Sequence, residues 1–118
     1  MNLFLYRATE PDQIHQMVAR VVEEWGRLDI FVNNAGRGSP SLPAEEVSIE
    51  DWEWTMTLNL RSAFLCVRAV VPVMKRQGYG RIVIVSSLAG RSYGRLTSLQ
   101  YGTAKAGLAA FSRSIAMA

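Results

Sequence analysis

Cysteine and histidine are nearly absent from this chain, since Cys66 and His15 are the only ones. A single cysteine excludes an internal disulfide and is typical of proteins of the reducing cytoplasm, where we expect this chain to reside. Cys66 falls in the apolar part of a predicted helix, which favours a small core side chain over a nucleophile. His15 has no second histidine or cysteine near it, so no metal site is predicted.

Long apolar runs and strong charge are missing too. No stretch of about 18 consecutive apolar residues occurs, so we expect no membrane partner, and the first residues turn polar too soon for a secretory signal. The net charge is only +3 and the arginines are scattered, so nucleic-acid binding is not expected. The length of 118 residues allows one domain with a moderate core.

Three short apolar segments alternate with three longer segments of helical periodicity. The predicted strands are residues 3–8, Ile30–Asn33 and 82–85, and the predicted helices are Pro11–Trp25, residues 51–77 and Leu99–Met117. This order is typical of an α/β fold, a Rossmann-like parallel sheet with flanking helices and right-handed crossovers. We expect the strands to lie in sequence order, with Ile30–Asn33 in the middle.

Cap residues set the expected helix boundaries. Thr9 is the expected cap of the first helix and Gly26 its end. Ser48, with Asp51 three residues later, is typical of a capping box at the start of the long second helix. Pro72 is expected to kink that helix. Apolar spacing predicts its inward face, which consists of Trp52, Met56, Leu60, Ala63, Phe64, Val67, Val71 and Met74.

Tyr101 and Lys105 are four residues apart in the last predicted helix, which stacks them on one face, one turn apart. A phenol is a weak acid at neutral pH, and a nearby ammonium favours its ionised form. Such a tyrosine can act as a general acid or base. The pair alone is a weak signal, because a packed tyrosine beside a solvated lysine is common.

Further motifs accompany this pair. Asn-Asn-Ala-Gly at 33–36 follows the second predicted strand, Asn59 lies inside the long helix, and Ser86 and Ser87 end the third strand. Open α/β sheets bind their ligands at such carboxyl ends of strands. On these motifs, in this order, nearly the whole chain resembles the short-chain dehydrogenase/reductase family; each motif alone is weak, and together they are specific.

The resemblance implies an NAD(P)-dependent oxidoreductase that transfers a hydride between a nicotinamide and a small-molecule carbonyl or alcohol. Tyr101 would be the general acid or base, and Lys105 would favour its ionised form and hold the ribose hydroxyls. Ser87, which precedes x-x-Gly as in the family, would bind the substrate oxygen beside Tyr101. Asn59 would kink its helix and join a proton relay, or else be a satisfied buried amide. For either serine the alternative is a strand-end hydroxyl bonded to the backbone, which suits Ser86 better than Ser87.

The resemblance also implies that the backbone of Asn34, Ala35 and Gly36 lies along the cofactor ribose, where glycine permits a close approach. The asparagine side chains of this motif would tie the central strands together. The cofactor would be NAD or NADP, a choice that the sequence leaves open. In the family, helices corresponding to residues 52–77 and 99–117 pack against a neighbouring subunit, which implies a homo-oligomer.

Two parts of the family pattern are missing from these 118 residues. No Thr-Gly-x-x-x-Gly-x-Gly turn for the cofactor diphosphate occurs, and no substrate-binding lid follows the last helix. We therefore expect a partial dinucleotide-binding domain over residues 1–118. The alternative is a truncated, non-catalytic fragment or interaction module that keeps the catalytic residues without binding cofactor. An epimerase or dehydratase is a weaker alternative, because Asn-Asn-Ala-Gly favours the dehydrogenases.

Overall fold

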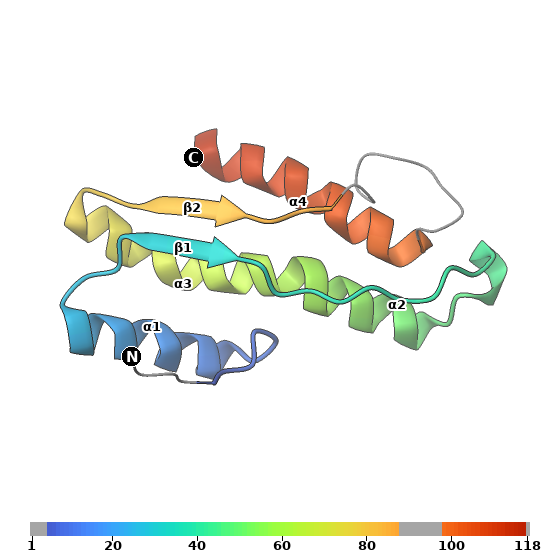
Figure 1. The fold of residues 1–118 in the computed structure, drawn as a ribbon, viewed down its shortest axis with the longest axis horizontal. Coiled ribbons are helices and arrows are strands. Elements are labelled where there is room, and N and C mark those ends of the chain that lie inside the picture. The colour runs from blue at the N-terminus through green and yellow to red at the C-terminus, as the bar shows by residue number, and fades with distance from the viewer. Residues whose placement is uncertain (1–4, 88–97, 118) are drawn as a thin grey trace.

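The computed structural model describes residues 5–87 and 98–117, which form a small parallel sheet with flanking helices (Figure 1). In chain order the elements are α1 (Pro11–Trp25), β1 (Ile30–Asn33), the 3₁₀ turn η1 (Ala44–Glu46), α2 (Ile49–Met56), the π-helical η2 (Thr57–Arg61), α3 (Ser62–Gln77), β2 (Arg81–Ile84) and α4 (Leu99–Met117). The predicted α/β class is confirmed.

The sheet consists of β1 and β2, paired in parallel with Ile30 opposite Arg81 and Val32 opposite Val83. Because strand side chains alternate between faces, the two faces differ. Phe31 and Ile82 pack against the helical core, whereas Ile30 and Val32 are exposed. The predicted parallel pairing of the second and third strands is therefore confirmed.

The predicted first strand is wrong for the residues that the structure describes. Residues 5–8 form no strand, Leu5 is 88% exposed, and the expected three-stranded order does not occur. Their backbone groups are bonded locally instead. Arg7 N donates to Gln13 Oε1 at 2.7 Å and Glu10 N donates to Arg7 O at 3.2 Å. This turn leads directly into α1.

The helix boundaries follow most of the predicted caps. Gly26 ends α1 at a φ of 74°, in the left-handed region that favours glycine, and its N–H donates to Val22 O. Ser48 Oγ accepts from Asp51 N at 3.0 Å and caps α2. The prediction for Thr9 is wrong, because the residue before α1 is Glu10 and its side chain forms no cap.

The long helix is interrupted at η2, and α3 continues through Pro72 to Gln77. A π-helical turn holds more residues than an α-helical turn and so rotates the face that follows it. Of the predicted inward residues that follow η2, Ala63, Val67 and Met74 are buried as predicted, whereas Phe64 is 51% exposed. The buried residues of α3 are Ser62, Ala63, Leu65, Cys66, Val67, Ala69, Val70, Val73 and Met74.

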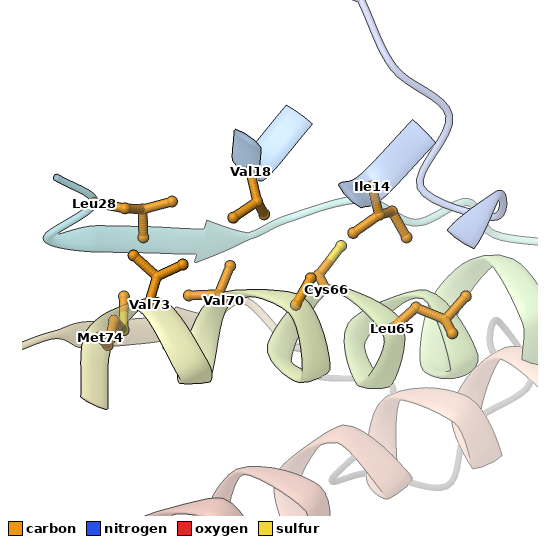
Figure 2. Close-up of a cluster of buried hydrophobic side chains, with 9 residues drawn as sticks. Ile14, Val18, Leu28, Leu65, Cys66, Val70, Val73 and Met74 are labelled. Carbon is orange, nitrogen blue, oxygen red and sulfur yellow. The ribbon is translucent and has the colours of Figure 1, made fainter. Parts of the chain in front are cut away.

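The main core lies between α1, α3 and the helical side of the sheet (Figure 2). Ile14 and Val18 of α1 point toward Cys66 and Val70 of α3. Helix α4 packs elsewhere, against α2 and η2. The stretch Ile49–Gln77 is long and apolar enough to cross a membrane by length and composition, but half of its most apolar window is buried inside the molecule, as in a core helix.

Gln77, the last residue of α3, clamps the start of β1. Its Oε1 accepts from Leu28 N at 2.7 Å, and its Nε2 donates to Leu28 O at 2.8 Å. Leu28 is buried, so both of its backbone groups depend on this one side chain. The clamp fixes where the strand begins relative to the helix.

We expect Gln77→Leu to lower the free energy of unfolding by about 2 kcal/mol or more, because two buried backbone groups lose their partner. Urea denaturation followed by circular dichroism measures this change. The matched control is Gln16→Leu on the exposed side of α1, which should cost less than about 0.5 kcal/mol. Equal losses in the two variants would contradict the clamp.

Candidate active site

The candidate site lies where the carboxyl ends of β1 and β2 meet the beginning of α4. Lys105 of α4 contacts both ends. A Cβ added to Gly36, beyond β1, would lie 2.9 Å from Lys105 Nζ. Ser86 Oγ, beyond β2, donates to the main-chain oxygen of Lys105 at 3.0 Å. The strand ends and the helix therefore converge on one lysine.

Tyr101 and Lys105 lie one turn apart on α4, with Lys105 Nζ 5.6 Å from the centre of the Tyr101 ring. Lys105 is only 5% exposed, while Tyr101 is half-buried. No aspartate or glutamate among the described residues forms an ion pair with Lys105. A buried ammonium without a carboxylate is costly unless other polar groups solvate it. Lys105 is therefore a buried cation that no carboxylate of the described residues neutralises.

Asn59, in the middle of η2, is fully buried, and both its amide oxygen and its amide nitrogen bond to backbone groups. Its Oδ1 accepts from Arg37 N at 3.0 Å, and its Nδ2 donates to Arg37 O and Thr55 O, both at 2.9 Å. This is the satisfied buried amide that the sequence left as one alternative. It joins the loop after β1 to the long helix.

Gly36 sits directly against this amide. A Cβ at this position would lie 2.5 Å from Asn59 Oδ1, in addition to its contact with Lys105. No side chain fits there without displacing a neighbour, so the requirement for glycine is steric. The residues just before it, Asn34 and Ala35, are exposed. Both residues also line the pocket beside the end of β1.

The two serines that follow β2 differ. Ser86 holds the backbone of α4, as described above, which confirms the structural alternative for it. Ser87 is half-buried next to it, at the end of the described segment, and also makes an interaction there. Residues 88–90 of the expected Ser-x-x-Gly motif lie outside the described residues. Ser86 thus ties the end of β2 to α4.

Sequence reasoning missed the residues that anchor the beginning of α4. Ser98 is 2% exposed, and its Oγ accepts from Tyr101 N at 3.1 Å and bonds Ser39 Oγ at 3.0 Å. Gln100 Nε2 donates to Asp51 Oδ2 of α2. A serine just before a helical stretch is an N-cap signal that could have identified Ser98. No local sequence pattern indicates the contact of Ser98 with Ser39 or that of Gln100 with Asp51.

Asn33 and Cys66 line a cavity of about 160 Å³ beside the open side of β1. Asn33 is 2% exposed, and its Nδ2 has no partner among the described residues. In the described part of the chain, no side-chain hydrogen bond of Asn33 joins neighbouring strands, so the expectation that it ties them together is not confirmed. Burial raises the pKa of the Cys66 thiol, which therefore stays neutral, as a core residue should.

A family model described as short chain dehydrogenase matches residues 3–118. The chain therefore belongs to the short-chain dehydrogenase/reductase family, as the resemblance of its motifs predicted. It is 35% identical over 105 residues to a 3-oxoacyl-[acyl-carrier-protein] reductase of Synechocystis sp., covering 89% of this chain and 42% of that protein. It is 34% identical over 109 residues to a D-beta-hydroxybutyrate dehydrogenase of Rhizobium meliloti, covering 92% and 42%.

Solved structures extend this likeness to the fold. An NADPH-dependent 3-quinuclidinone reductase from Rhodotorula rubra is 30% identical with a TM-score of 0.91, over 97% of this chain and 43% of that one. An NAD+-bound xylitol dehydrogenase is 30% identical with a TM-score of 0.90, over 97% and 44%. The Rossmann-like fold class is thus confirmed. The chain spans about two fifths of the length of these relatives.

We expect Gly36→Ala to disrupt the site, because its Cβ would overlap Asn59 Oδ1 and crowd Lys105 Nζ. The loss in unfolding free energy should be about 1–3 kcal/mol, the range for overpacking. In NMR spectra the side-chain amide resonance of Asn59 should shift. Gly38→Ala is the matched control, since nothing lies within 4 Å of its added Cβ. A silent Gly36→Ala would show that the loop moves freely.

Proposed function

We propose that the site belongs to an NAD(P)-dependent oxidoreductase that interconverts a carbonyl and an alcohol. The observation that carries this proposal is the convergence of Gly36, Asn59 and Lys105 next to Tyr101, at the carboxyl ends of two parallel strands. This edge of an open α/β sheet is where ligands of such folds bind. Membership of an oxidoreductase family supports the same assignment.

In this proposal Tyr101 is the general acid in reduction and the general base in oxidation. Its phenol donates a proton to the forming alkoxide, or takes one from the alcohol. The Lys105 ammonium, buried one turn away, favours the ionised phenol electrostatically. Ser87 donates a hydrogen bond to the substrate oxygen and stabilises its developing negative charge.

The exposed backbone of Asn34, Ala35 and Gly36 would hold the nicotinamide end of the cofactor, with Lys105 on the ribose hydroxyls. The buried, carboxylate-free ammonium beside Gly36 fits this role, because hydroxyl oxygens can solvate it. The bound nicotinamide supplies or accepts the hydride. One structural neighbour is named as NAD+-bound and another as NADPH-dependent, so either cofactor fits the proposal.

Asn59 acts in this proposal as a positioning residue. Its amide hydrogens are both used on Arg37 O and Thr55 O. By holding Arg37 at both backbone groups, it fixes the preceding Gly36 against Lys105. Asn59 Oδ1 already accepts one hydrogen bond, from Arg37 N. A role for Asn59 in a proton relay would therefore use the second lone pair of this oxygen.

The substrate we propose is a small molecule with a carbonyl or secondary alcohol. Relatives are named for 3-oxoacyl, D-beta-hydroxybutyrate and 3-hydroxy acid substrates, which share that functional group. We also propose that residues 1–118 are part of a dinucleotide-binding domain, that the protein resides in the cytoplasm, and that nucleic acids and membranes are not its partners.

The general acid is tested in a chimera in which residues 3–118 replace the matched segment of the Thermotoga maritima 3-oxoacyl-[acyl-carrier-protein] reductase, which is 38% identical. Tyr101→Phe should lower kcat at least about 1,000-fold with little change in cofactor affinity, because the phenol acts in the chemical step. Nicotinamide absorbance and fluorescence measure the two quantities. Tyr79→Phe, at an exposed tyrosine, is the control. Near-normal turnover of Tyr101→Phe would refute its role.

We further propose a homo-oligomer formed through residues 52–77 and 99–117. Phe64 of α3, half exposed on the long helix, supports this surface. Phe64→Glu should reduce the sedimentation coefficient of the chain to that of a monomer at tens of micromolar, because it buries a charge in an apolar contact. Trp25→Glu, at an exposed aromatic on α1, should leave the oligomer intact. A wild-type chain that already sediments as a monomer would contradict the proposal.

A further inference from the structure

Helix α4 carries Tyr101, and apolar packing holds the beginning of this helix only weakly. The buried residues of α4 are Gln100, Ala104, Lys105 and Leu108. Of these only Ala104 and Leu108 are apolar, and both lie after Tyr101 in the chain. The turn that contains Tyr101 is therefore fixed mainly by the polar contacts that it makes.

Ser98, directly before α4, makes two of these contacts with one oxygen atom. Its Oγ accepts from Tyr101 N at 3.1 Å and bonds Ser39 Oγ at 3.0 Å, and the residue is 2% exposed. A hydroxyl has one hydrogen and two lone pairs, so Ser98 can serve both partners at once. Because the backbone of Tyr101 and the side chain of Ser39 share this buried oxygen, a displacement of Ser39 displaces the first turn of α4.

The other member of the pair belongs to the loop that follows β1. Ser39 comes three residues after Gly36 and two after Arg37, whose backbone groups both bond to Asn59. The same loop contains the backbone that would hold the nicotinamide end of the cofactor in the proposed function. The Ser39–Ser98 pair therefore joins the proposed cofactor loop to the helix of the proposed general acid.

We propose that the Ser39–Ser98 hydroxyl pair positions the Tyr101 phenol for proton transfer, by fixing the first turn of α4 relative to the loop after β1. This inference rests on the proposed function, because it requires Tyr101 to be the general acid. Proton transfer needs the donor within hydrogen-bond distance of the reacting oxygen. A displacement of about 1 Å can lower the rate about 100-fold. In this proposal both serines are positioning residues, since they act through Tyr101.

A second polar contact keeps α4 in place when the serine pair is removed. Gln100 is fully buried, and its Nε2 donates to Asp51 Oδ2 in the first turn of α2. This contact does not involve the loop after β1. We therefore expect loss of the serine pair to shift the turn that contains Tyr101 slightly rather than to detach the helix.

The first test is amide hydrogen exchange in the 118-residue chain, which requires no cofactor. Ser98→Ala removes the acceptor of Tyr101 N, so exchange of this amide should be at least about tenfold faster. Ser39→Ala leaves this acceptor but removes its hydroxyl partner, and should accelerate the exchange by a smaller factor. The control is Ser114→Ala, because Ser114 Oγ donates only to Ala110 O of the same helix. Unchanged exchange in both test variants would overturn the proposal.

The second test measures turnover in the chimera with the Thermotoga maritima reductase. Ser39→Ala and Ser98→Ala should each lower kcat about tenfold or more while KM changes less than about twofold, because the phenol is displaced but the binding groups remain. Ser39→Thr keeps the hydroxyl and should retain most of kcat, and Ser114→Ala should retain all of it. Normal kcat in both alanine variants would overturn the proposal.

A double-mutant cycle with Tyr101 separates positioning from a general loss of structure. In a Tyr101→Phe background no phenol is left to position, so adding Ser39→Ala should lower kcat less than about twofold. An equal fall in both backgrounds would indicate a merely structural role and would overturn the proposal. Near-normal turnover of Tyr101→Phe itself would refute the proposed function and this inference with it. An inactive Tyr101→Phe beside fully active serine variants would refute this inference alone.

Discussion

Two side-chain amides of the long helix hold the segment that leads into the site. Gln77 clamps both backbone groups of Leu28, and Asn59 clamps both backbone groups of Arg37. The helical residues are 18 positions apart, about 27 Å along a helix, and the clamped residues are nine positions apart, about 30 Å when extended. Because these lengths agree, β1 and the loop after it lie stretched along the helix, as Figure 1 shows. Gly36, next to the second clamp, is thereby held against Lys105.

The sequence predicted those parts of the fold that depend on local pattern. Helical periodicity identified α1 and α4, β-branched runs identified β1 and β2, and Gly26 and Ser48 marked helix ends, because each of these signals acts within a few residues. The site residues were found differently, through motifs that resemble a known family. The structure brings Gly36, Asn59, Tyr101 and Lys105 together, while their chemical roles remain proposals.

The failures share a physical cause, which is dependence on distant partners. Residues 3–8 have strand-like side chains, but a strand needs a neighbour, and the backbone of Arg7 is bonded instead to Gln13 within a turn. Phe64 has inward spacing, yet it is 51% exposed, while Ala63 and Leu65 on either side of it are buried. The contacts of Ser39 with Ser98 and of Asp51 with Gln100 span 59 and 49 residues, so no local pattern reveals them.

The buried asparagines Asn59 and Asn33 differ in whether their side-chain amides are hydrogen-bonded. Asn59, fully buried, has both of its amide hydrogens bonded within the chain. Asn33, equally buried at the end of β1, has an unpaired Nδ2 beside a cavity and an open strand edge. An isolated chain would gain by replacing such a group with an apolar one. Two buried side-chain atoms are thus without a partner among the described residues, Asn33 Nδ2 at the end of β1 and Gln100 Oε1 at the beginning of α4.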